Sequence, residues 1–397
     1  MEKQKNIPYL RFPEFEGEWV KKKLGELSII NPTTDKLPDK FIYIDLESVI
    51  NGDLTKELIV FKNEAPSRAQ RVLKKDDILF QMVRPYQKNN LYFDKSGDYV
   101  ASTGYAQIKT KQNSRFIFQY LYLQKFVDEV IEKCTGTSYP AINSKDLAKI
   151  SICYPTLPEQ QKIASFFTAI DQKILQLKRK KTLLEEYKKG VMQKIFSQGI
   201  RFKDDNGQEF PKWEKKRLGN ILNERNIQVP KSDEYPLMAF VANKGVAHKG
   251  ERYNREFLVN DGDNKKYKQT EYGDFIYSSN NLETGSIGLN SFGSASISPV
   301  YSIFQIDESC NPQFLGCYFV RKSFINKMTS YRQGVVYGQW RIHESDFLKI
   351  EEWIPSTTEQ TKIANFLSAI DDKINHTQKQ VEKAEVWKKG LMQQMFC

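Results

Sequence analysis

Residues 155–174 have the sequence PTLPEQQKIASFFTAIDQKI, and residues 355–374 have the sequence PSTTEQTKIANFLSAIDDKI. A second match follows in the same register, with EEYKKGVMQKIF at 185–196 and EVWKKGLMQQMF at 385–396. Between residues 155–196 and residues 355–396, 19 of 42 positions are identical without a gap. An internal repeat of this length determines the architecture of the whole chain. The sequence therefore predicts two copies of one unit.

The repeat continues more weakly in the segments that precede the two matching stretches. WVKKKLGEL from Trp19 resembles WEKKRLGNIL from Trp213, and DLAKI from Asp146 matches DFLKI from Asp346. Elsewhere the two copies differ, which favours one scaffold that carries two different surfaces. We place a first variable domain at 1–154, a central helical segment at 155–200, a second variable domain at 201–354 and a C-terminal helical segment at 355–397.

The composition indicates a folded protein with a polyanionic partner. A chain of 397 residues exceeds what one core usually organises, and apolar residues at 40% suffice for two or more cores. No apolar run approaches the ~20 residues of a membrane span, and the opening MEKQKNIPYLRF lacks a signal-peptide stretch, so we expect a cytoplasmic protein. A net charge of +11 favours nucleic acid over a membrane surface, while a simple contribution to solubility stays open.

The matching stretches have the apolar spacing of coiled-coil helices. Apolar residues recur at alternating intervals of four and three, which is typical of a seam between paired helices. Since each helix alone would be marginal, we expect the two to pair. Pro155, Pro158 and Pro355 lie where the helices should begin. The seam residues are Ile163, Phe167, Ile170, Ile174, Leu177 and Leu184 in the first helix, and Ile363, Leu367, Ile370, Ile374, Val381 and Leu391 in the second.

The length of the first helix suggests how two domains could be spaced on DNA. From Glu159 to Phe196 it has 38 residues, which at ~1.5 Å each span about 57 Å, longer than the ~34 Å of one duplex turn. An antiparallel pair would relate the domains by a pseudo-twofold axis, the symmetry of two half-sites. The basic residues 178–181, 188 and 189 could form a solvated, a DNA-facing or a docking surface.

Each variable domain is expected to belong to the α+β class. Short alternating runs at Phe41–Leu46, Ile78–Val83 and Phe275–Ser278 predict strands. The stretches 116–133 and 314–328 have apolar residues at helical spacing. The predicted fold is therefore two α+β domains in a tandem pseudo-repeat, separated by two long helices that form an antiparallel coiled coil.

Candidate DNA-contacting residues lie in polar segments of both variable domains. These segments combine side chains that recognise base edges with phosphate donors and with aromatic or glycine residues. In the first domain the segments are 68–75, 84–90 and 135–143, and their candidate residues are Arg68, Arg71, Lys74, Arg84, Tyr86, Gln87, Lys88, Asn89, Asn90, Ser138 and Tyr139. In the second domain the segments are 243–255, 265–268, 278–281 and 332–341, and their candidate residues are Lys244, His248, Lys249, Arg252, Tyr253, Lys265, Lys266, Asn280, Asn281, Arg332, Tyr337, Gln339 and Arg341. Surface loops contain such residues routinely, so each is a candidate for contact with DNA.

Motifs of catalysis are missing from the sequence. The five cysteines match no zinc spacing and the three histidines are isolated, so neither a metal site nor a histidine-based catalytic group is expected. There is no Walker A loop and no glycine-rich methyl-donor loop, and INPTTD at 30–35 has only the first part of an Asn-Pro-Pro-aromatic motif. An acid-x-Lys triplet at 371–373 lies on the repeated helix. We expect no catalysis by this chain alone.

The proline followed by EQ-x-KIA and AID-x-KI, copied at an interval of 200 residues, resembles the specificity subunit of type I restriction-modification enzymes. The resemblance covers essentially the whole chain. It implies two target recognition domains, each recognising one half of a split DNA site, with the helices holding them at a fixed separation. It also implies two adenine-methylating subunits and two ATP-dependent restriction subunits as partners. S-adenosylmethionine, ATP and magnesium would belong to those partners, and this chain would need no cofactor.

Two other classes of function stay open at this point. One is a self-sufficient DNA methyltransferase or nuclease, which the missing motifs disfavour. The other is a structural coiled-coil scaffold with unrelated end domains, which predicts no affinity for DNA. The contact residues cannot be carried over from the family, because its variable domains differ most where they contact DNA.

Overall fold

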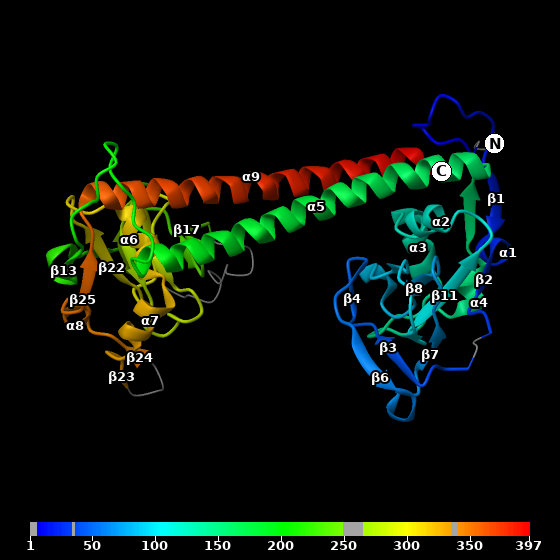
Figure 1. Cartoon of the computed structure of the whole chain (residues 1–397), viewed down its shortest axis with the longest axis horizontal. Helices are drawn as coiled ribbons and strands as arrows, with labels where there is room; N and C mark the ends of the chain where they lie inside the picture. Colours follow the sequence, from blue (N-terminus) through cyan, green and yellow to red (C-terminus); the bar gives the residue numbers. More distant parts are fainter. Residues whose placement is uncertain (1–5, 34–35, 249–264, 335–339) are drawn as a thin grey trace. The chain divides into compact units, whose positions relative to one another are not determined.

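The computed structural model describes residues 6–33, 36–248, 265–334 and 340–397 (Figure 1). The chain divides into two units, unit 1 with residues 1–181 and 377–397 and unit 2 with residues 182–376. Each unit contains one mixed domain of strands and short helices together with parts of the two long helices. The predicted boundaries at 154, 200 and 354 are not tested by this division and stay a prediction.

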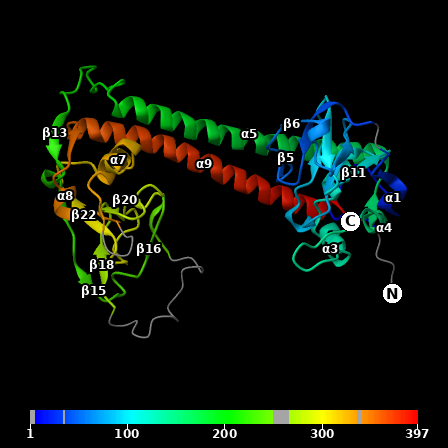
Figure 2. The same cartoon turned by 90° about the horizontal axis from the view of Figure 1, so that it is seen from below.

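The two long helices are α5 (Leu157–Phe196) and α9 (Thr357–Met395), and both lie within the segments predicted to be helical. Pro158 occupies the first turn of α5, where its missing N–H needs no partner. In unit 1, Asp171 of α5 pairs with Lys388 of α9 at 2.6 Å, and Lys178 pairs with Glu385 at 2.8 Å. Since the numbers rise along α5 as they fall along α9, the helices run antiparallel, as predicted (Figure 2).

The predicted seam is largely buried, and some of its residues also pack into the core of a domain. The buried seam residues are Ile163, Phe167, Ile170, Ile174, Leu177, Ile363, Leu367, Ile370 and Val381, while Leu184, Ile374 and Leu391 are half-buried. Ile163 and Phe167 belong to the same core as Trp19 and Phe116 of the first domain. The start of each seam therefore joins its helix to a domain as well as to the other helix.

The first domain, in unit 1, contains two four-stranded sheets. One has the order β2 (Ser28–Ile30), β11 (Tyr105–Thr110), β8 (Ile78–Gln81), β9 (Leu91–Tyr92), with all neighbours antiparallel. The other has the order β6 (Leu58–Phe61), β3 (Lys40–Ile44), β10 (Tyr99–Ser102), β7 (Ala69–Val72), with β3 and β10 parallel. The shorter pairs are β1 (Val20–Lys23) with β12 (Ser151–Tyr154) and β4 (Val49–Ile50) with β5 (Asp53–Leu54).

The second domain, in unit 2, repeats one sheet of the first and changes the other. The repeated sheet has the order β14 (Leu222–Glu224), β22 (Ser302–Ile306), β19 (Phe275–Tyr277), β20 (Ile287–Leu289). Within the described residues, the second sheet has three strands, β15 (Gln228–Val229), β18 (Tyr267–Thr270) and β21 (Ala295–Ile297). The pairs are β13 (Glu214–Arg217) with β25 (Glu351–Ile354), β16 (Ala239–Val241) with β17 (Gly245–Ala247), and β23 (Gln333–Gly334) with β24 (Trp340–Arg341). The strands predicted from alternation correspond to β3, β8 and β19.

Each predicted stretch of helical spacing forms two helices instead of one. In unit 1 they are α2 (Ser114–Tyr120) and α3 (Gln124–Glu132), and in unit 2 they are α6 (Pro312–Phe319) and α7 (Lys322–Thr329). The second helix of each pair follows a residue with extended backbone, Leu123 or Arg321. Because the apolar spacing continues across the break, periodicity alone does not reveal it. The remaining short helices are α1 (Leu24–Leu27), α4 (Ser144–Lys149) and α8 (Glu344–Phe347).

The repeated Glu-Gln pair joins each long helix to its domain. In unit 1, Glu159 is buried and accepts from Arg11 Nε at 2.8 Å and from Arg11 Nη2 at 2.7 Å. The side chain of Gln160 donates to the Pro155 carbonyl oxygen at 2.8 Å and accepts from the Asn113 backbone N–H at 3.1 Å. Asn113 in turn caps α2 by accepting from the Phe116 N–H. The start of α5 is thus tied to the start of α2.

The same contacts recur in unit 2. Glu359 accepts from Arg201 Nε at 3.2 Å and from Arg201 Nη2 at 2.6 Å. Gln360 donates to the Pro355 carbonyl oxygen at 2.9 Å and accepts from the backbone N–H of Asn311, the cap of α6, at 2.8 Å. The Glu-Gln pair is therefore repeated in sequence because it makes the same contacts in each unit.

The phenylalanine that ends each matching stretch also has one role in both units. In unit 1, Phe396 stacks on Phe116 with the ring centroids 5.3 Å apart. In unit 2, Phe196 forms T-shaped ring pairs with Phe314 and Tyr318, with the ring centroids 6.1 and 5.2 Å apart. The C-terminal end of each long helix therefore completes the core of the domain in its own unit. No helix in the described part of the chain is long and apolar enough to cross a membrane.

Candidate nucleic-acid interface

In the first domain, two of the three predicted DNA-contacting segments meet beyond the end of β8. The segment 84–90 follows β8, and the segment 135–143 lies between α3 and α4. The Arg84 backbone N–H donates to the Pro140 carbonyl oxygen at 2.8 Å, and the Arg84 guanidinium lies 4.2 Å from the centroid of the Tyr139 ring. We name this surface, formed by 84–90 and 135–143, loop pair 1.

The side chain of Gln81, at the end of β8, holds loop pair 1 from within. Its Nε2 donates to Gln87 Oε1 at 2.9 Å, and its Oε1 accepts from the Asn89 backbone N–H at 3.0 Å. Asn90 is 1% exposed and accepts from the Gln81 N–H at 2.9 Å. Two of the candidates, Gln87 and Asn90, therefore support the loop, whereas Tyr86 is 48% exposed and free to contact a ligand.

Left-handed backbone shapes the first part of loop pair 1. Arg84 has φ +53° and Lys88 has φ +55°, on either side of the short 3₁₀ helix at 85–87. Residues other than glycine rarely adopt this conformation, and it persists only where surrounding contacts determine it. Lys88 is further held by donating from Nζ to Gln124 Oε1 at 3.0 Å. These contacts therefore give the loop a defined conformation. Ser138, in the 135–143 part of loop pair 1, is exposed.

The third predicted segment of the first domain, 68–75, lies on the other sheet and includes its edge strand β7. Arg68 and Lys74 are exposed. Arg71 is half-buried, and burial lowers the pKa of its guanidinium from the ordinary value. The structure therefore places this segment on a different element of the domain from loop pair 1.

The corresponding segments also meet in the second domain. Asn280, just after β19, accepts through Oδ1 from the Trp340 backbone N–H of β24 at 2.6 Å. Ser279 accepts through Oγ from the Ile342 backbone N–H at 3.1 Å. We name the surface formed by 278–281 with 332–334 and 340–342 loop pair 2. In each domain, two candidate segments therefore meet at the same place on the repeated sheet, beyond β8 in the first domain and beyond β19 in the second.

The arginines of loop pair 2 differ in their contacts. Arg332 donates from Nη1 and Nη2 to the two carboxylate oxygens of Glu283 at 2.6 and 2.7 Å, which makes it a support for the loop. Arg341 is 58% exposed, with Nη2 3.7 Å from a Glu344 oxygen. Trp340, which the sequence did not single out, is 50% exposed. In the sequence, only the position of Trp340 between the candidates Gln339 and Arg341 could have indicated that it belongs to this surface.

The other candidates of the second domain are spread over its surface. Lys244 lies in the turn between β16 and β17, Lys265 and Lys266 precede β18, and all three are exposed. His248 is exposed, with its ring centroid 5.4 Å from that of Phe292, and Asn281 is exposed within loop pair 2. The candidates Lys249, Arg252, Tyr253, Tyr337 and Gln339 lie outside the described residues.

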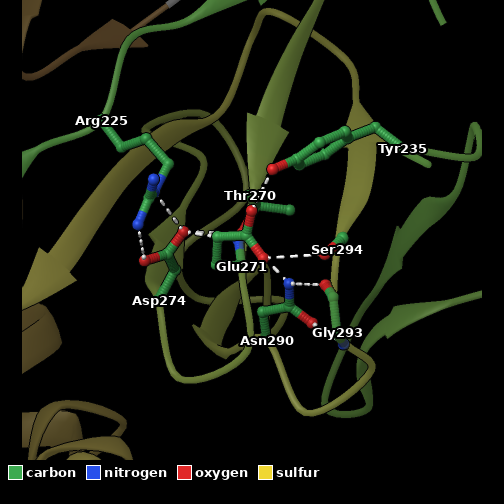
Figure 3. A network of polar contacts seen from close by, with 8 residues as sticks. All are labelled: Arg225, Tyr235, Thr270, Glu271, Asp274, Asn290, Gly293 and Ser294. Carbon is green, nitrogen blue, oxygen red and sulfur yellow. Dashed lines mark hydrogen bonds and ion pairs between the residues drawn. The ribbon is translucent and has the colours of Figure 1, made fainter. Parts of the chain in front are cut away.

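A buried ion pair supports the turn that leads into β19 and hence into loop pair 2 (Figure 3). Asp274 is 2% exposed and pairs with Arg225, whose Nε lies 2.8 Å from Asp274 Oδ2 and whose Nη2 donates to Oδ1 at 3.3 Å. Asp274 also accepts from Thr270 Oγ1 at 3.1 Å and from the Glu271 N–H at 2.7 Å. Burial raises the pKa of Asp274, and the donors partly oppose this effect. The carboxylate thus fixes the turn on one side of β19, opposite the end that carries loop pair 2.

Further polar contacts extend this network toward β21 (Figure 3). Glu271 accepts from the hydroxyls of Ser294, at 2.9 Å, and Tyr235. Asn290 Nδ2 donates to Thr270 Oγ1 at 3.2 Å and to the Gly293 carbonyl oxygen at 2.7 Å. Four segments of the second domain are therefore joined at this end of β19.

The first domain has a simpler counterpart at Asp77. Asp77 is buried and accepts through Oδ2 from the Lys74 N–H at 2.7 Å and from Gln107 Nε2 at 2.7 Å. Burial raises the pKa of Asp77, as it does for Asp274. DILF at 77–80 and DFIY at 274–277 are weakly similar in sequence, and each begins with the aspartate that fixes the turn before β8 or β19.

The described residues contain no group of three or more histidine, cysteine, aspartate or glutamate residues that could hold a metal ion. The acid-x-Lys triplet at 371–373 serves the helix pair, because Asp371 accepts from Lys188 Nζ at 2.6 and 2.7 Å. Two members of the basic run on α5, Lys178 and Lys188, therefore face carboxylates of α9.

Comparisons with known proteins agree with the repeat and with the fold. Residues 16–186 and 211–385 both match the family model for the type I restriction modification DNA specificity domain. The putative type I restriction enzyme MjaX specificity subunit of Methanocaldococcus jannaschii is 26% identical over 416 aligned positions, covering 98% of this chain and 95% of that protein.

Two solved structures share the fold along nearly the whole chain. The type I restriction-modification system S subunit from M. genitalium is 15% identical with a TM-score of 0.58, covering 98% of this chain and 99% of that one. A chain from a structural study of complex assembly and conformational transition of the type I R-M system is 19% identical, with a TM-score of 0.57 and coverage of 97% and 98%. With both halves matched by one family model and the repeated scaffold present in both units, this chain belongs to the family of type I restriction-modification DNA specificity subunits.

Proposed function

We propose that this chain recognises a bipartite DNA site through loop pairs 1 and 2 and directs partner subunits to methylate adenine there or to cleave the DNA. The observation that carries the proposal is that each domain presents two polar segments at the same place on the repeated sheet, beyond β8 in the first domain and beyond β19 in the second. The scaffold is repeated, while the segments on it differ, as expected for two different half-sites.

The charge of the chain supports DNA as the ligand. A net charge of +11 favours association with phosphates, and such binding weakens steeply as salt concentration rises. Phosphate contacts position a protein on DNA, whereas base edges supply specificity. In this proposal the exposed lysines position the domains and the exposed side chains of the loop pairs distinguish sequences.

Catalysis would reside in the partners. We propose a complex with two modification subunits, to which two restriction subunits can be added, with S-adenosylmethionine, ATP and magnesium bound by those partners. This chain would act in the cytoplasm, where the DNA lies, and would use no cofactor of its own. Support comes from its family and from the sequence, which lacks the loops that bind a methyl donor or a nucleotide.

The test is to express the chain with its modification partner in a host without adenine methylation and to map methylated adenines across the genome. We expect one motif made of two short specific parts separated by unspecified bases. Exchanging residues 1–154 for the first domain of another family member should change one part and leave the other unchanged. A continuous motif, or a change in both parts, would contradict the proposal.

The two alternatives predict different results. A self-sufficient methyltransferase would bind S-adenosylmethionine and methylate DNA without a partner, which calorimetry and a methyl-transfer assay on the purified chain would reveal. A structural scaffold would show no DNA binding that depends on salt and no methylation motif in the expressed complex.

A further inference from the structure

An open polar groove lies beside loop pair 2 in the second domain. Its volume is about 440 Å³. Segments distant in sequence form its walls. The lining includes Glu224, Asn226, Lys268, Asn280, Trp340 and Arg341. All of them belong to unit 2, and they come from the shared sheet, from the three-stranded sheet and from loop pair 2. The groove is thus assembled by the tertiary fold.

The charges that line the groove balance one another. Glu224 and Glu344 carry two negative charges, and Lys268 and Arg341 carry two positive charges. Lys268 is 6% exposed, and its ammonium donates to the Tyr301 carbonyl oxygen at 3.0 Å. A phosphate site needs an excess of positive charge, so this groove suits a neutral ligand with polar edges, such as a nucleobase.

Two exposed donors at the groove are oriented by the protein. Asn280 uses its Oδ1 to accept from the Trp340 N–H, which directs its Nδ2 away from that contact, and among the described residues Nδ2 has no acceptor. Arg341 is 58% exposed and presents a planar fork of N–H donors. Donors of this kind complement a base edge with two acceptors, and guanine O6 and N7 form such an edge in the major groove.

Trp340 is held in place although its side chain is half-exposed. Its strand β24 pairs with β23, and the backbone N–H groups of Trp340 and Ile342 both donate to side chains of the loop after β19. An exposed tryptophan on a fixed backbone loses little conformational entropy on binding and provides apolar contact next to the donors.

We propose that this groove recognises the major-groove edge of a guanine in the half-site of the second domain. Arg341 donates to O6 and N7, and Asn280 Nδ2 donates to an acceptor of the same or the adjacent base. Trp340 packs against the neighbouring base or sugar. This assignment rests on the proposed function and adds to it the position and the chemistry of one specific contact.

The experiment uses the full chain expressed with its modification partner, and it maps methylated adenines for the wild type and for variants. Arg341→Ala should relax one guanine of one half-site, with methylation of sites that carry another base there rising about 5- to 150-fold relative to the guanine site, the discrimination that a bidentate contact provides. Arg341→Lys keeps the charge and loses the fork, so the same position should relax. Asn280→Asp keeps the acceptor for Trp340 and replaces the donor, so it should disfavour the guanine as well.

Lys349→Ala is the matched control, because Lys349 is an exposed cation of the same domain that pairs with Asp346 away from the groove lining. It should leave the motif unchanged. The half-site of the first domain must stay fully specified in every variant, which shows that the complex assembles.

Two outcomes overturn the inference while leaving the proposed function intact. One is an unchanged two-part motif in the Arg341 and Asn280 variants. The other is a uniform loss of methylation in Arg341→Ala that Arg341→Lys restores, since this would identify a phosphate contact. A wild-type complex without a two-part motif would instead contradict the proposed function itself.

Discussion

Lys188 of α5 donates to both carboxylate oxygens of Asp371 of α9, at 2.6 and 2.7 Å. Lys388 and Asp171 make the same ion pair in unit 1 at 2.6 Å. Both pairs derive from repeated residues, the aspartate of AID and the first lysine of KKG. Each pair therefore aligns α5 with α9 in the same register in its own unit.

We expect Lys188→Ala to lower the free energy of unfolding of unit 2 by at most ~1 kcal/mol, because the Asp371 carboxylate is 42% exposed and solvent screens the pair. The charge-exchanged double variant Lys188→Asp/Asp371→Lys should recover most of the loss. Urea unfolding of the wild type, Lys188→Asp, Asp371→Lys and the double variant forms a double-mutant cycle. Strictly additive effects would show that the two side chains do not interact.

Replacing the arginine beside the buried glutamate should cost more. Arg201→Ala leaves the Glu359 carboxylate, 1% exposed, without its partner, and removing one member of a buried pair typically costs ~3–5 kcal/mol. Unfolding in urea, followed by tryptophan fluorescence, measures the loss. Arg201→Ala combined with Glu359→Gln should recover part of it, because the neutral amide tolerates burial better.

Arg11→Ala should be milder than Arg201→Ala. In unit 1, Trp19 Nε1 also donates to Glu159 at 3.3 Å, whereas Trp213 Nε1 of unit 2 has no hydrogen-bond partner among the described residues. Glu159 therefore keeps one donor when its arginine is lost. A larger loss for Arg11→Ala than for Arg201→Ala would contradict this account.

Phe396→Ala should detach the end of α9 from the first domain. Its ring is 7% exposed and stacks on Phe116, and truncation of a buried phenylalanine typically costs ~3–5 kcal/mol. Hydrogen exchange should show lower protection in the last turns of α9 and in α2, with little change in unit 2. Phe396→Leu, which keeps most of the apolar volume, is the control. Unchanged protection in Phe396→Ala would refute this role.

The buried carboxyl of Asp77 should make stability depend on pH. Burial raises its pKa in the folded state, so its stabilising contribution is complete below the ordinary aspartate pKa of ~3.9 and is lost as the pH rises through the folded pKa. Asp77→Asn keeps an oxygen for the Lys74 and Gln107 donors and removes the titration. The variant should gain stability relative to the wild type as the pH is raised from about 4, by urea unfolding. A constant difference at all pH values would argue against a buried charge.

The repeated sequence determined the scaffold because each repeated position makes one contact twice. The glutamate and glutamine of EQ bind the arginine and the helix cap of their own unit, and the aspartate of AID pairs with the lysine of KKG. The seam spacing predicted the helix pair, since a period of 3.5 residues is encoded locally. The division of 116–133 into two helices could not be predicted, because the apolar spacing continues through the break.

Only the tertiary structure decided which candidates form one surface. Arg84 and Tyr139, or Asn280 and Trp340, are separated by more than fifty residues in sequence, and no local pattern predicts that they meet. Asn90 and Arg341 are both polar residues in similar segments. Only the structure shows that Asn90 is buried and supports a loop, whereas Arg341 is exposed. The physical reason is that helix pairing depends on periodic apolar burial within one segment, whereas a recognition surface depends on polar contacts between loops that only the packed sheets bring together.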